Sequence, residues 1–112
     1  MQENSVVLTW ESLYDVTDIS DYIEYEFGIE RATKFQSDMQ QEFSKLKYTG
    51  GIFRKTNILY RNYYIRMKPF PPSIIFYALD DKENQVSVLR VLREEQDCEN
   101  ILRNNQDYSF PN

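Results

Sequence analysis

The residue types that most often carry acid–base or metal chemistry are nearly missing from this sequence. The chain contains no histidine, which removes the commonest general base and the commonest neutral metal ligand. Cys98 is the only cysteine, so neither an internal disulfide nor a Cys–His nucleophile can form. The acids of the first 30 residues have no histidine or cysteine near them, and Gly50-Gly51 lacks the lysine spacing of a phosphate-binding loop. We therefore expect no cofactor and no metal site.

The charged residues are separated along the chain. Residues 1–30 carry eight acids and no base, whereas residues 44–79 carry seven bases and no acid. The net charge of −5 hides this separation. A basic segment of this kind binds phosphates or an acidic partner. The alternative is that it balances the acidic helix inside the same fold.

Several polar side chains have two interpretations. Four tyrosines lie among the bases, where they either stack on single-stranded nucleic acid or are ordinary strand residues; they are Tyr60, Tyr63, Tyr64 and Tyr77. Arg90 lies inside an apolar strand, where an unpaired charge is costly. We expect it to pair with an acid of the first helix rather than to face solvent or a partner. Asp15, Asp18 and Asp21 are expected to form a solvated face.

Apolar periodicity predicts the elements of the first half. Residues 6–10 are rich in β-formers and predict a strand, and Ser12 with Asp15 resembles a capping box. Two helix faces follow, joined at Gly28 and ended by Gly50-Gly51, so an antiparallel hairpin is expected. Their apolar positions are Leu13, Val16, Ile19, Ile23 and Phe27, then Ala32, Phe35, Met39, Phe43 and Leu46.

The second half of the sequence predicts β-strands. Residues 58–67, 73–79 and 86–92 predict an antiparallel meander, with the prolines at 69, 71 and 72 breaking the first run. Asp97 is expected to cap a short last helix, and residues 104–112 to form a frayed tail. The prediction is one α+β domain over residues 1–112: an N-terminal strand, a helix hairpin packed on a small twisted antiparallel sheet, and a short C-terminal helix. Because we find neither a secretory leader nor a membrane span, a cytoplasmic location is expected.

This order of elements, with three groups of residues, resembles the RelE/ParE superfamily of type II toxin–antitoxin toxins, and most closely its ParE-like branch. The first group is Leu8-Thr9-Trp10 with Asp15-Val16, Ile19 and Asp21-Tyr22-Ile23, which resembles the family opening. The second is Ala32, Phe35 and Leu46. The third is Ile75-Phe76-Tyr77, similar to the family's "RIFY" strand, and Val88 to Leu92 with Asp97, similar to "ILRVLHxRRD".

The resemblance implies a growth-inhibiting toxin that binds a target such as DNA gyrase and is neutralised by a cognate antitoxin. It implies no membrane partner and no sequence-specific DNA binding by this chain alone. Arg61 matches the basic residue that follows Tyr60 in the family's second strand, and Arg93 stands where the family has histidine. The residues expected to bind the target or the antitoxin are Arg54, Lys55, Tyr60, Arg61, Arg66, Lys68, Arg90 and Arg93.

Two other functions remain open: a ribosome-dependent mRNA endonuclease, and a non-toxic interaction module that keeps only the fold. Phosphodiester cleavage needs a base, an acid and cationic help. Ile74 replaces the family arginine, Arg93 cannot act as a base, and Glu95 and Gln96 replace a basic pair. These departures count against the endonuclease and leave the catalytic residues unknown.

Overall fold

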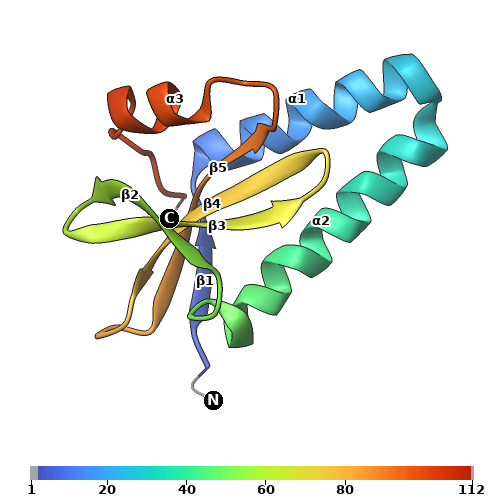
Figure 1. The fold of residues 1–112 in the computed structure, drawn as a ribbon. Helices are drawn as coiled ribbons and strands as arrows, with labels where there is room; N and C mark the ends of the chain where they lie inside the picture. Colours follow the sequence, from blue (N-terminus) through green and yellow to red (C-terminus); the bar gives the residue numbers. More distant parts are fainter. Residues whose placement is uncertain (1–2, 112) are drawn as a thin grey trace.

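A computed structural model describes residues 3–111 of the chain as a helix hairpin, a five-stranded sheet and a short third helix (Figure 1). The α+β class is confirmed. The elements in chain order are β1 (Ser5–Leu8), α1 (Trp10–Phe27), α2 (Ile29–Thr49), β2 (Arg54–Tyr60), β3 (Tyr63–Phe70), β4 (Ser73–Asp80), β5 (Gln85–Arg93) and α3 (Cys98–Asn104). No helix within the described residues is long and apolar enough to cross a membrane.

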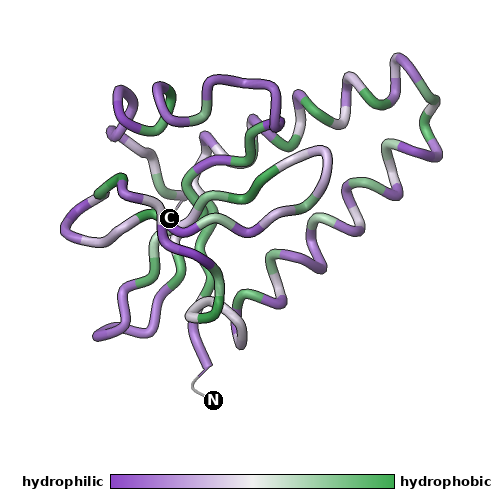
Figure 2. The backbone as a smooth tube through the Cα atoms, viewed as in Figure 1, coloured by the Kyte–Doolittle hydropathy of each residue, from purple (hydrophilic) through white to green (hydrophobic). Residues whose placement is uncertain are grey.

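The sheet has the strand order β1-β5-β4-β3-β2, so its two edges are β1 and β2. Strands β2 to β5 form the expected antiparallel meander, and β1 is added parallel to β5. The strands predicted at 73–79 and 86–92 are confirmed as β4 and β5. Figure 2 shows that hydrophobic residues gather along these central strands.

The single strand predicted over 58–67 is wrong, because these residues belong to two strands. Arg61 and Asn62 both adopt positive φ, 49° and 72°, and form a two-residue turn between β2 and β3. Such turns usually carry Asn-Gly or Asp-Gly, so Arg-Asn gave no clear signal. Pro69 does not break β3 either. It lies beyond Met67, the last β3 residue paired with β2, so its missing N–H removes no hydrogen bond to β2.

The helix hairpin covers one face of the sheet. All five apolar residues predicted for the second helix are buried, whereas Phe27 at the end of the first is exposed. Gly28 joins the helices at φ 98°, a conformation that glycine adopts without strain. The cap of α1 is Thr9 rather than Ser12: the Thr9 hydroxyl accepts the N–H of Ser12 and also donates to β5 carbonyls. The predicted first strand accordingly ends at Leu8.

The opposite face of the sheet is covered by α3 and the C-terminal tail. Asp97 caps α3 by accepting the N–H of Asn100, as predicted. The frayed tail predicted after residue 104 is wrong within the described residues. Tyr108 is buried against Tyr60, and the Ser109 backbone bonds the Trp10 N–H and the Glu11 carboxylate. The tail therefore runs from α3 back to the start of α1 and completes a second small core.

Candidate functional site

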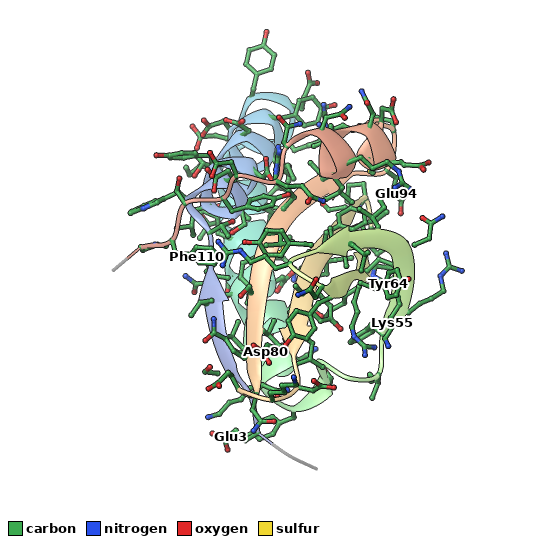
Figure 3. The ribbon with its side chains drawn as sticks, turned by 90° about the vertical axis from the view of Figure 1, so that its left-hand side faces the viewer. Glu3, Lys55, Tyr64, Asp80, Glu94 and Phe110 are labelled. Atoms are coloured by element: carbon green, nitrogen blue, oxygen red, sulfur yellow. The ribbon has the colours of Figure 1, made fainter. Side chains whose placement is uncertain are left out.

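The β2 strand forms an exposed sheet edge that combines a base with apolar surface. Cross-strand pairing places Lys55 opposite Arg66 and Leu59 opposite Tyr64, so these four side chains share the face on which the hairpin packs. Leu59 and Tyr64 are about half exposed, because the hairpin does not extend over this edge. Figure 3 shows Lys55 and Tyr64 on the same side of the molecule, away from Phe110. We call Lys55, Leu59, Tyr64 and Arg66 the edge patch.

The two β3 bases expected to bind a partner are held by the fold itself. Arg66 donates to the carbonyls of Gly51 and Phe53, at 3.2 and 2.8 Å, and so fixes the loop that follows α2. Lys68 is buried, forms a salt bridge with Glu42 and lies 4.6 Å from the Phe53 ring centroid. Arg66 keeps some exposed surface for a partner, and Lys68 offers almost none.

The turn at the end of β2 places Arg61 over aromatic rings. Its guanidinium lies 5.2 Å from the Tyr60 ring and 5.8 Å from the Phe110 ring. Tyr60 itself is buried, and its hydroxyl has no hydrogen-bond partner among residues 3–111. Arg54 lies on the opposite face of β2 from Lys55 and approaches the Met67 sulfur at 3.7 Å. Arg54 and Lys55 thus present charge on both sides of one edge strand.

Arg90 makes the internal pair that the sequence predicts. The Asp15 carboxylate accepts from Arg90 Nε at 2.7 Å and Nη2 at 2.8 Å, and also accepts the Val91 N–H at 2.9 Å. Burial raises the pKa of Asp15, although Arg90 and the Val91 N–H oppose this. The prediction that Asp15 lies on a solvated face is wrong, whereas Asp18 and Asp21 are exposed as expected.

Arg93 lies far along the chain from the edge patch, beside a groove that sequence reasoning missed. Its guanidinium is 5.4 Å from the Tyr22 ring and its Nε is 3.4 Å from Glu95. The groove, about 470 Å³, lies between the hairpin and the β3–β4 turn. Its apolar lining includes Ile19, Ile23, Phe27, Phe35, Phe70, Pro71 and Pro72. The Pro71-Pro72 pair and Phe27 were the available signals, but nothing in the sequence brings the two segments together.

Burial shifts the pKa of two tyrosines and of the cysteine upward. Burial raises the pKa of Tyr108 to about 12 and also raises that of the Cys98 thiol. The pKa of Tyr77, whose hydroxyl donates to the Gly50 carbonyl, is raised still further by burial. These shifts move both tyrosines and the thiol away from the neutral range that a general acid or base needs. Within residues 3–111, no three acidic or thiol side chains gather as metal ligands.

The acidic and basic segments of the chain do not neutralise each other. Among the described residues, one salt bridge joins an acid of residues 3–30 to a base of residues 44–79, Lys47 with Glu3. The other bases of that segment that form salt bridges, Lys45 and Lys68, pair with Glu42. The molecule therefore presents an acidic α1 and, at the opposite edge of the sheet, a basic β2.

Comparisons with known proteins give a consistent result. Residues 6–98 match the family model described as the ParE toxin of the type II toxin–antitoxin system parDE. A solved chain of the chromosomal ParDE TA system from P. aeruginosa has the same fold, with a TM-score of 0.70 at 20% sequence identity. That match covers 83% of this chain and 98% of the other. A search of curated protein sequences found no match.

Proposed function

Because the chain belongs to the ParE toxin family of type II toxin–antitoxin systems, we propose that it arrests growth by binding DNA gyrase in the cytoplasm and that a cognate antitoxin neutralises it. The observation that carries the proposal is the edge patch, a cationic and apolar surface on an open strand. A toxin that acts by binding needs such a surface and needs no general base. The lack of histidine and the raised tyrosine and thiol pKa values support this mode of action.

The antitoxin is proposed to add an acidic, extended segment to the β2 edge. Open strands accept a further strand through their unpaired backbone groups. From α3 and the tail, Arg103 reaches Asn57 and Gln106 reaches the Leu59 carbonyl. Within the described residues, no hydrogen bond from α3 or the tail reaches Arg54–Thr56. This half of β2 is therefore the part that a partner strand would occupy, with its acids facing Arg54 and Lys55.

The antitoxin interface is tested with the product of the neighbouring gene. Lys55→Glu should weaken antitoxin binding by about tenfold, which corresponds to about 1.4 kcal/mol. The matched control is Lys82→Glu, an exposed lysine in the β4–β5 turn, which should leave the Kd within about twofold. The double variant Arg54→Glu with Lys55→Glu tests the same interface. A double charge reversal at Arg61 and Arg66 would be harder to interpret, because Arg66 also holds the loop after α2. Equal Kd values for the Lys55 and Lys82 variants would show that the antitoxin binds elsewhere.

The target is tested separately from the antitoxin. Induced expression should arrest growth, and the purified chain should inhibit supercoiling by gyrase without cleaving transcripts on programmed ribosomes. Ribosome-dependent cleavage that is abolished by Arg93→Ala would instead identify an mRNA endonuclease. A lack of growth arrest from a folded chain would identify an interaction module that keeps only the fold.

A further inference from the structure

The solvent-facing side of α1 carries aromatic rings that the fold leaves uncovered. Trp10, Tyr14 and Tyr25 are 43%, 63% and 87% exposed. With Asp18 and Asp21 they recur at steps of four, four, three and four residues, which places all five on one helix face. We call these five residues the α1 stripe. The buried face of α1, centred on Ile19, points the other way, toward α2 and β5.

The stripe is long and already partly ordered. Fifteen residue steps at about 1.5 Å each give it a length of roughly 22 Å. Trp10 and Tyr14 stack with their ring centroids 6.2 Å apart, so this end is preorganised. Within residues 3–111, the hydrogen bonds from the tail to α1 lie at the start of the helix, at the Trp10 N–H and the Glu11 carboxylate. In Figure 1 the closed end of the hairpin lies beyond the sheet. Exposure of the aromatic rings increases in that direction, from Trp10 through Tyr14 to Tyr25.

The charge around the stripe decides which partner fits it. Asp18 and Asp21 form no salt bridge within residues 3–111, and neither do Glu24 and Glu26 beside them. No lysine or arginine occurs before residue 31. A nucleic acid or an anionic lipid surface would be repelled by these carboxylates. A cationic polypeptide would be attracted, and its arginines would find both carboxylates and aromatic faces.

The fold shows the same recognition chemistry next to the stripe. Arg93 lies 5.4 Å from the Tyr22 ring, and Arg31 lies 4.9 Å from the Phe27 ring. Exposed tyrosine and tryptophan are also the residue types that dominate binding energy at interfaces. We propose that the α1 stripe is a docking surface for an arginine-rich segment of another protein, separate from the edge patch on β2.

A second copy of this chain is a weaker candidate for this surface. Its basic β2 edge has the right sign, but an α1-to-β2 contact is head-to-tail and generates open filaments unless the rotation closes. The proposed partner is therefore a different protein. Sedimentation of the purified chain tests this point: it should remain monomeric, and self-association that Tyr14→Ser abolishes would assign the stripe to a second copy and overturn the proposal.

The binding experiment uses the emission of Trp10, the only tryptophan of the chain, as a local reporter. The probe is a 16-residue alanine-based helical peptide with arginine at every fourth position and no aromatic residue. It should shift Trp10 emission saturably. Tyr14→Ser or Tyr25→Ser should weaken binding about fivefold or more. Tyr48→Ser, which removes a 51% exposed tyrosine at the end of α2, should leave it within about twofold.

Two double variants that remove the same charge from different places distinguish local recognition from the effect of net charge. Asp18→Asn with Asp21→Asn should weaken binding clearly more than Asp81→Asn with Glu83→Gln, which removes the same charge from the β4–β5 turn. Equal losses from the two pairs would mean that only net charge attracts the peptide, and the proposal would fail. Equal affinity for a glutamate-substituted peptide, or peptide binding without a change in Trp10 emission, would overturn it as well. Lys55→Glu should not affect this binding, so the result is independent of the antitoxin interface.

Discussion

The Asp15 carboxylate joins α1 to the strand end of β5 through three hydrogen bonds. It accepts two from the Arg90 guanidinium and one from the Val91 N–H, at a point beyond the last β1 residue paired with β5. Both side chains are largely buried, with 12% and 20% exposure. Removing one partner leaves the other charge in a poorly hydrated site, which is far more costly than removing both.

We therefore expect Asp15→Ala to lower the free energy of unfolding by about 3 kcal/mol. Asp18→Ala, one turn along the same helix, should change it by less than about 0.5 kcal/mol. Denaturant unfolding of Asp15→Ala, Arg90→Met and the double variant forms a complete cycle. The double variant should lose clearly less than the sum of the two single changes. An additive result would mean that the two residues do not interact.

Glu42 gives the fold a defined acid sensitivity. Burial would raise the pKa of its carboxyl, but hydrogen bonds from Lys68 and Lys45 outweigh this and lower it from the usual value of 4.5. The folded state then binds the proton less tightly than the unfolded state, so stability from this site is present above pH 4.5 and is lost as pH falls below it. Glu42→Gln should reduce stability at pH 7 and flatten its decline between neutral and acidic pH. Parallel declines in the two proteins would assign the sensitivity to other carboxyls.

At the scale of elements, the C-terminal tail acts as the cover of the second core. Tyr108 packs edge-on against Tyr60, with ring centroids 5.4 Å apart, and its hydroxyl is buried without a partner among residues 3–111. Tyr108→Ala should lower the free energy of unfolding by about 3 kcal/mol, because it removes a large buried ring. Tyr108→Phe should be neutral or slightly stabilising, since it removes an unsatisfied hydroxyl. Thermal unfolding measures both, and equal effects of the two changes would show that the ring is not packed.

At the scale of the whole molecule, acidic α1 and basic β2 lie toward opposite edges of the sheet. The basic β2 edge then attracts an acidic antitoxin segment before the two proteins touch. Dissolved salt screens this long-range attraction. We expect the association rate with the antitoxin to fall by about tenfold or more between 50 mM and 500 mM salt. Arg54→Glu with Lys55→Glu should flatten this dependence as seen in stopped-flow mixing. A salt-independent rate in the unmodified chain would exclude electrostatic steering toward the edge.

The sequence determined the features that depend on local periodicity and local chemistry. The apolar face of α2, the part of the α1 face from Val16 to Ile23, the stop at Gly28, the two central strands and the Asp97 cap are confirmed, because helix and strand periods and caps are set by neighbouring residues. The internal pairing of Arg90 was also predictable. A charge inside an apolar strand needs a partner, and the first helix carries acids that could supply it.

Tertiary structure decided which charged and aromatic residues remain available for binding. Lys55, Arg66 and Lys68 look alike in the sequence, yet of the three only Lys55 is exposed, because β3 carries the other two toward the loop after α2 and toward Glu42. The tail after residue 104 has no periodicity, and its docking depends on the distant Tyr60 and Trp10. The groove beside Arg93 likewise forms between segments that only the folded chain brings together. These contacts join residues tens of positions apart, so no local pattern specifies them.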